Sequence, residues 1–114
     1  MERKKELKML YKEMKPPMGV LMIHSNLRQK CYLEATANVA AKINRYRFQL
    51  NHGSHPNQTL QRDWQELGAD SFTIEILEHL PYDKDESKTD YTDDLALLEM
   101  TWEEKLTQKG WEFY

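Results

Sequence analysis

The chain has 114 residues, of which 31% are charged and 39% hydrophobic, and its formal net charge is −3. This length supports one hydrophobic core and is too short for two domains of ordinary size. No apolar run reaches the roughly 20 residues of a membrane span, and a single cysteine, Cys31, excludes an intramolecular disulfide. Because the charged N-terminus lacks the apolar core of a signal peptide, we expect a cytoplasmic protein without membrane contact.

The two halves of the chain carry opposite charges. Residues 1–62 contain 12 Lys and Arg against 4 Asp and Glu, whereas residues 63–114 contain 4 against 15. The first half is suited to face a polyanion such as DNA or RNA, and the second half would repel one unless a cation lies between them. Mutual attraction of the two halves within the fold is the alternative explanation.

The N-terminal third predicts a helix followed by a β-hairpin. Residues 1–15 carry apolar side chains at helical spacing with charges elsewhere, which indicates an amphipathic helix that ends before two consecutive prolines. Residues 19–24, GVLMIH, are apolar on both faces, as in a central strand. A polar turn separates them from residues 30–35, KCYLEA, which form the returning strand.

Two helices are predicted next. The first starts at a cap, either Thr36 or Asn38, and ends at Gly53, with an apolar stripe that includes Tyr46. The second is shorter, begins at Asn57 and closes at a glycine, residue 68.

The last third predicts a strand, a polar loop, a helix and a tail. Residues 71–80 alternate and are β-branched, which favours a strand, and residues 95–108 have a helical apolar stripe. Residues 108–114 form a tail with three aromatic side chains that docks on the core or frays. The whole order predicts an α+β fold with a three-stranded, mainly antiparallel sheet flanked by helices.

From the hairpin onward, this order resembles the GIY-YIG nuclease domain. That family carries Gly-Ile-Tyr on its first strand and Tyr-Ile-Gly on its second, and this chain has GVL at residues 19–21 and YLE at residues 32–34. The resemblance covers residues 17–107, nearly the whole chain beyond an extra helix at residues 1–15. It implies a GIY-YIG-like domain that precedes the 108–114 tail.

The resemblance implies catalytic roles for several residues. Tyr32 matches the tyrosine that aligns or deprotonates the attacking water, and His55 matches a histidine assigned to proton transfer or to orienting the site. Glu99 matches the glutamate that holds the single divalent metal, Mg²⁺ or Mn²⁺. Lys42 stands where the family has an arginine.

The chain departs from the family motif at further positions, and each departure weakens phosphodiester chemistry. Leu21 replaces the first tyrosine and removes a hydroxyl. Glu34 replaces the glycine of the second motif and sets a negative charge where the family brings phosphate close to bare backbone. Lys42 keeps a positive charge but lacks the fork with which a guanidinium grips phosphate bidentately.

The same residues also have ordinary structural interpretations. Glu99 falls inside an apolar helical stripe, where a carboxylate is costly unless paired; it is a capped or snorkelling side chain, a metal ligand, or the ion-pair partner of Lys42. The structural interpretation of Tyr32 is a core tyrosine, and that of His55 is a solvent-facing turn residue.

Three functions follow from the sequence. The first is a divergent GIY-YIG-type nuclease-fold protein with catalysis lost or much reduced, in a nucleic-acid-binding or accessory role that uses Lys42, Arg45, Arg47 and Arg62. An ordinary charged surface is the alternative for these basic residues. The second function is an active endonuclease that requires Mg²⁺ or Mn²⁺; without activity we expect no cofactor. The third is a protein-interaction module, such as a homodimer formed through the N-terminal helix.

Overall fold

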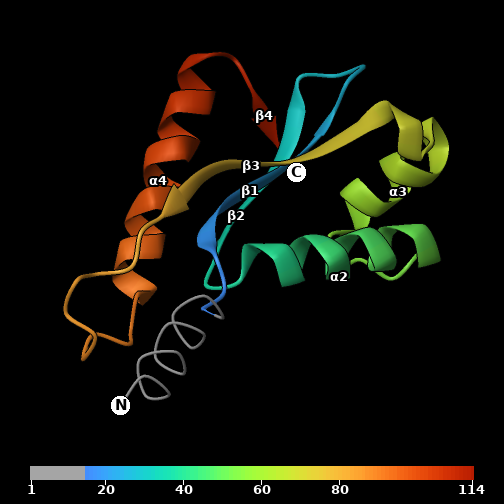
Figure 1. Ribbon diagram of the computed structural model, residues 1–114. Coiled ribbons are helices and arrows are strands. Elements are labelled where there is room, and N and C mark those ends of the chain that lie inside the picture. The colour runs from blue at the N-terminus through green and yellow to red at the C-terminus, as the bar shows by residue number, and fades with distance from the viewer. Residues whose placement is uncertain (1–14) are drawn as a thin grey trace.

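The computed structural model describes residues 15–114, so the predicted N-terminal helix and any dimer formed through it lie outside the described residues. The described chain forms a sheet with helices on both faces (Figure 1). Its elements, in chain order, are β1 (Met18–Ser25), β2 (Lys30–Thr36), α2 (Val39–His52), α3 (Gln58–Leu67), the short 3₁₀ helix η1 (Ala69–Ser71), β3 (Phe72–Leu80), α4 (Thr92–Gln108) and β4 (Glu112–Phe113).

The sheet has four strands in the order β3-β1-β2-β4, and β1 pairs antiparallel with both β2 and β3. The α+β class is therefore confirmed, whereas the prediction of three strands is wrong. Residues 112–113 of the tail add β4, which pairs parallel with β2 at Lys30 and Cys31. A strand of two residues has no period to detect, and Gly110, at φ 87°, reverses the chain between α4 and this strand.

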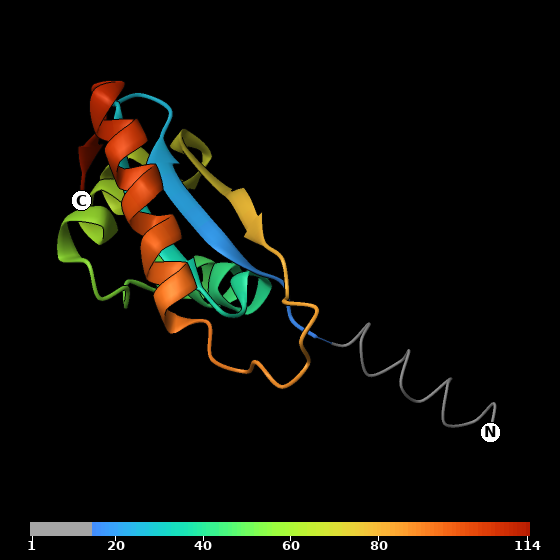
Figure 2. The ribbon, with the colours of Figure 1, turned by 90° about the vertical axis from the view of Figure 1, so that its left-hand side faces the viewer.

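The helices form two layers. Helices α2 and α3 cover one face of the sheet and α4 covers the other (Figures 1 and 2). On the α2 face, Leu21 and Ile23 of β1 pack with buried residues of both helices, and on the α4 face Met22 packs with Cys31 and Leu106. Successive residues of β1 thus face opposite layers, which is why this strand is apolar throughout.

The helix boundaries agree with the predicted caps. The Asn38 side chain accepts a hydrogen bond from the backbone N–H of Ala41, and Gly53 ends α2 in the left-handed conformation at φ 77°. Asn57 caps α3 in the same way. Helix α4 begins three residues before the predicted start at residue 95.

Gly19, the first residue of the GVL motif, allows β1 and β3 to approach closely. A Cβ atom at this position would lie 2.2 Å from the backbone oxygen of Glu78 on β3, so no other residue fits without a shift of the strands. The register between β1 and β3 shifts between Val20 and Leu21, directly after this glycine. Within residues 15–114, no helix has the length and apolarity needed to cross a membrane.

Candidate active site

The β-hairpin places the two motif departures directly opposite each other. Leu21 of β1 and Glu34 of β2 are register partners, and paired residues of neighbouring strands project to the same face. Leu21 is fully buried in the core beneath α2. The position that loses a tyrosine hydroxyl is therefore adjacent to the one that gains a carboxylate.

The Glu34 carboxylate is surrounded by hydrogen-bond donors. The Tyr46 hydroxyl of α2 donates to it, at 2.7 Å from Oε1 and 2.8 Å from Oε2. The Tyr32 hydroxyl lies 3.3 Å from Oε1, and Lys42 Nζ lies 3.9 Å from Oε2. With 24% of its side chain exposed, Glu34 occupies a largely enclosed polar pocket between β2 and α2.

Both tyrosines are held in their protonated form at neutral pH. Burial raises the pKa of Tyr32; the hydrogen bond with Tyr46 opposes this effect, and the charge and hydrogen bond of Glu34 add to it. Burial, followed by the hydrogen bonds with Tyr32 and Glu34, holds the pKa of Tyr46 far above its usual value. In this arrangement the two hydroxyls act as donors to Glu34 and are poor bases for an attacking water.

His55 is buried, with 5% of its surface exposed, so the solvent-facing alternative is wrong. Its Nδ1 accepts a hydrogen bond from the backbone N–H of Asn57, which leaves the proton of the neutral ring on Nε2. Nε2 is buried and has no hydrogen-bond partner among the described residues. Burial lowers the pKa of His55, so the ring is a neutral N–H donor within the site.

The His55 ring belongs to the same aromatic cluster as the tyrosines. Its centroid lies 4.7 Å from that of Tyr46 and 5.2 Å from that of Tyr32, and both pairs meet edge to face. The negative charge of Glu34 acts on the ring and partly offsets the lowering of its pKa by burial.

Glu99 reaches the same region from the opposite layer. Its Oε1 accepts a hydrogen bond of 2.9 Å from the backbone N–H of Ala35 on β2. Because β4 pairs only with the start of β2, the edge N–H of Ala35 is left for this side chain. The structure therefore explains the inward carboxylate as a cap of the strand edge. Lys42 pairs with Glu34 instead of Glu99.

The four residues that the family resemblance assigns to the site lie close together. Tyr32 and Glu99 line one cavity of about 180 Å³ beside β2, and the charge of Glu99 contributes to the raised pKa of Tyr32. Tyr32 in turn contacts His55, while Lys42 lies beside Glu34 and above the Tyr46 ring. Their roles in chemistry stay predictions.

For a divalent metal, the chain offers a sparse ligand set. Among residues 15–114, no group of three or more His, Cys, Asp or Glu side chains is arranged to hold a metal ion. Magnesium is nevertheless often held by one or two carboxylates together with substrate phosphates and waters. Glu99 Oε2 has no hydrogen-bond partner in the described part of the chain, and Glu103 lines the same cavity. The donor set is therefore compatible with a weak, substrate-assisted site centred on Glu99.

The predicted nucleic-acid-binding residues are spread over two helices and over different flanks of α2. Because successive helical residues turn by about 100°, Lys42 and Arg45 lie roughly 60° apart on α2, whereas Arg45 and Arg47 lie roughly 160° apart. Arg62 belongs to a different helix, α3. Arg45, Arg47 and Arg62 are exposed and have no ion pair with any described residue. Only Lys42 and Arg45 share the flank of α2 that borders Glu34.

Tyr46 is the site residue that the sequence analysis missed. It falls on the apolar stripe of α2, which predicts a core position, and its ring is indeed buried. The available signal was a hydroxyl on that stripe four residues after Lys42, since residues four apart share a helix face. A buried hydroxyl requires a partner, and its partner is the unexpected Glu34.

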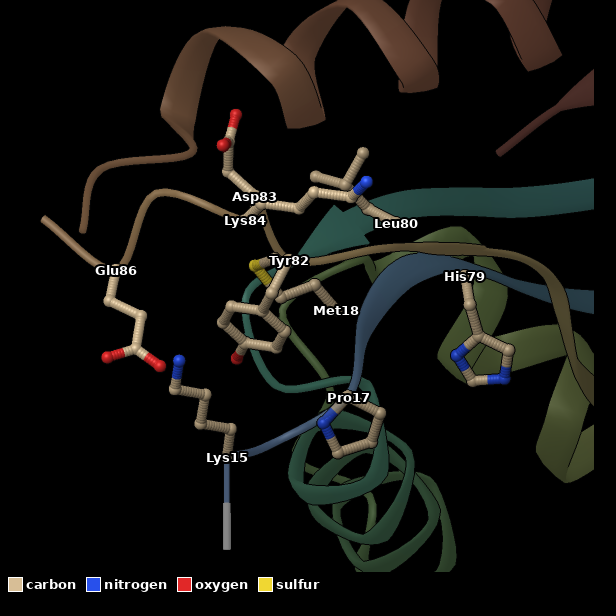
Figure 3. Close-up of a pocket in the computed structure, with 9 residues that line it drawn as sticks. All are labelled: Lys15, Pro17, Met18, His79, Leu80, Tyr82, Asp83, Lys84 and Glu86. Carbon is tan, nitrogen blue, oxygen red and sulfur yellow. The ribbon is translucent and has the colours of Figure 1, made fainter. Parts of the chain in front are cut away.

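The groove in Figure 3 is separate from this site. It has a volume of about 450 Å³ and lies at the end of β3, where Tyr82 and Met18 line it together with Lys15. None of the predicted site residues lines it.

Comparisons with known proteins identify the fold. No protein-family model matches the chain, and no curated protein matches it. Two solved structures do. One is the catalytic domain of the homing endonuclease I-TevI, with a TM-score of 0.64 and 26% identity over 83% of this chain and 94% of that domain.

The second is a glutamate-to-alanine mutant of the catalytic domain of the intron endonuclease I-TevI. It has a TM-score of 0.64 and 24% identity, over 86% of this chain and 92% of that domain. I-TevI is a GIY-YIG homing endonuclease. The described chain therefore has a nuclease-like α+β fold, and in particular a GIY-YIG-like fold, as the order of its elements from the hairpin onward predicted.

Proposed function

We propose that this protein is a GIY-YIG-fold module that binds nucleic acid and does not hydrolyse it. One observation carries the proposal: the Glu34 carboxylate fills the polar pocket formed by Tyr32, Tyr46 and Lys42. In the family the matching position is a glycine, beside which phosphate approaches the backbone. A phosphate entering this pocket would meet an enclosed negative charge, and the resulting repulsion opposes substrate binding before any chemistry begins.

The remaining residues supply little of what hydrolysis needs. The two tyrosine hydroxyls are donors with raised pKa values, and His55 presents a protonated nitrogen, so none of them is placed to accept a proton from water. Lys42 is engaged by Glu34 and is a point charge in place of a bidentate guanidinium. A divalent cation bound at Glu99 would neutralise charge on a phosphate, while Glu34 would still oppose the same phosphate.

Nucleic-acid binding is assigned to the flank of α2 that carries Lys42 and Arg45. Arg45 is exposed and free of ion pairs with described residues, and it lies one turn from Lys42. Lysine and arginine side chains in such positions bind phosphate backbones without reading sequence, and this binding weakens as salt increases. The proposal therefore predicts low-specificity, salt-sensitive binding to DNA or RNA.

Fluorescence anisotropy with a labelled DNA duplex and a labelled RNA strand tests this binding. We expect affinity that falls with salt, and we expect Lys42→Gln and Arg45→Gln each to reduce the log–log salt slope by about one. Arg47→Gln removes the same charge from the opposite flank of α2 and serves as the matched control. Absence of binding even at low salt, or an equal loss in the Arg47 variant, would contradict the assignment.

An active endonuclease is the second candidate, because Tyr32 lines one cavity with Glu99 and contacts the His55 ring, while Lys42 lies beside the neighbouring Glu34. Incubation with supercoiled plasmid and Mg²⁺ or Mn²⁺ separates the two functions. Nicking that disappears in Glu99→Ala and persists in Glu104→Ala, whose exposed carboxylate on α4 does not line this cavity, would establish this candidate. We expect no nicking by any of these proteins.

A further inference from the structure

We infer that Tyr32, Tyr46 and Lys42 form an oxyanion-binding site that is occupied by the chain's own Glu34 carboxylate. Glu34 is thus a specificity-determining residue that excludes phosphate, and its removal opens the site to a tetrahedral oxyanion such as inorganic phosphate. The inference rests on the proposed function only in that both concern this pocket.

The groups around the Glu34 carboxylate are all donors. One hydroxyl lies 2.7 and 2.8 Å from the two carboxylate oxygens, a second lies 3.3 Å from one of them, and an ammonium group lies 3.9 Å from the other. An ionised carboxylate only accepts hydrogen bonds, and a phosphate group offers the same kind of acceptor oxygens. The pocket therefore suits an anion whether the anion comes from the chain or from solution.

A fourth donor in the cluster is unused. His55 is 5% exposed, and its Nε2 carries the ring proton without any partner among residues 15–114. Buried donors are normally paired with a protein group or an ordered water, so this N–H is a further donor that an acceptor in the cluster can use. A carboxylate provides two oxygens and a phosphate provides four. We assign the unpaired N–H to a further oxygen of the larger anion.

Two further features bear on access to the site. Glu34 is partly exposed, with 24% of its side chain accessible to solvent. Leu21, its register partner on β1, is fully buried and brings no competing polar group. Replacing Glu34 by glycine removes the anion and leaves all of the donors in place.

Titration of inorganic phosphate at constant ionic strength, followed by two-dimensional amide NMR, tests the inference. For Glu34→Gly we expect saturable shifts of the amide signals of Lys42, Tyr46 and His55. For the unchanged protein we expect no saturable shift. Glu104→Gln changes the net charge by the same amount at an exposed position of α4 outside the site, and it should behave like the unchanged protein.

A second substitution identifies the donors. Adding Tyr46→Phe to Glu34→Gly should weaken phosphate binding by roughly tenfold or more, as expected for loss of a hydrogen bond to a charged group. If Glu34→Gly does not fold, Glu34→Ala replaces it with the same expected result.

Three results would overturn the inference. They are a folded Glu34 variant that ignores phosphate, an unchanged protein that binds phosphate equally well, and a Tyr46 substitution without effect. Nucleic-acid binding is measured separately, by the salt dependence of anisotropy in Arg45→Gln, so a failure of this inference is distinguishable from a failure of the nucleic-acid-binding assignment. Phosphate binding by the unchanged protein would in addition remove the argument against hydrolysis.

Discussion

Replacing Tyr46 by phenylalanine removes a single hydroxyl from the candidate active site and keeps the buried ring. That hydroxyl is the closest donor to Glu34, at 2.7 and 2.8 Å from its two oxygens. One O–H shared between two oxygens counts as one charge-assisted hydrogen bond, and such bonds contribute about 1.5–3 kcal/mol. Because 24% of the Glu34 side chain is exposed and water can partly replace the donor, we expect Tyr46→Phe to lower the free energy of unfolding by about 1.5 kcal/mol.

Urea unfolding at neutral pH measures this loss, and a double-mutant cycle assigns it to the pair. Tyr46→Phe and Glu34→Ala should be non-additive by about 1 kcal/mol, because each substitution removes the same contact. The matched control pairs Tyr46→Phe with Glu104→Ala on the exposed side of α4, and these effects should add within about 0.5 kcal/mol. Additive effects for Tyr46 and Glu34, or an unchanged stability in Tyr46→Phe, would refute the described pocket.

Three further predictions test the surroundings of the pocket. Glu99→Ala should lower the free energy of unfolding by about 1 kcal/mol, because the edge N–H of Ala35 loses its acceptor, whereas Glu99→Gln, which keeps an acceptor oxygen, should lose less; equal losses in urea unfolding would contradict the capping role. Burial lowers the pKa of His55, so the contribution of this residue to stability is complete above its unfolded pKa of about 6.5 and is lost as the pH falls through the lowered pKa of the folded state. The urea midpoint should therefore decline from neutral to mildly acidic pH, and it should decline less steeply in His55→Gln. The same pH dependence of the midpoint in both proteins would exclude this cause. Tyr114→Phe should lower the free energy of unfolding by about 1–2 kcal/mol, because the Tyr114 hydroxyl donates a hydrogen bond of 2.8 Å to the buried Asp63. Amide hydrogen exchange at residues 112–113 should become faster, and unchanged exchange there would show that this hydrogen bond does not hold β4.

Local signals were strong enough to predict most of the elements. Asn38, Gly53 and Asn57 mark helix ends through capping chemistry that acts within a few residues, and the structure keeps all three. The short strand β4 could not be predicted in the same way. Two residues have no period, and their pairing with Lys30 depends on α4 first bringing the tail back to β2.

Prediction of the site named residues but not their contacts. Residue types at family positions indicated Tyr32, His55 and Glu99; in the structure Tyr32 contacts His55 and lines a cavity with Glu99, and the roles of all three stay predictions. What each one contacts depends on packing between layers. Nothing local indicates that Ala35 needs a cap, or that Tyr46 turns its hydroxyl to Glu34.

The basic residues show a further limit of prediction from the sequence. Arg45 and Arg47 are only two residues apart in sequence, and composition alone treats them alike. Helical geometry separates them onto opposite flanks of α2, and only the contact between Lys42 and Glu34 shows which flank borders the site.

Plasmid nicking by a chain restored at its three motif departures tests the central claim most directly. The combined variant carries Leu21→Tyr, Glu34→Gly and Lys42→Arg, and it is compared with the unchanged protein on supercoiled DNA in Mg²⁺. If Leu21, Glu34 and Lys42 are what prevents hydrolysis, the unchanged protein leaves the plasmid intact while the restored chain nicks it. Efficient nicking by the unchanged protein would contradict that account.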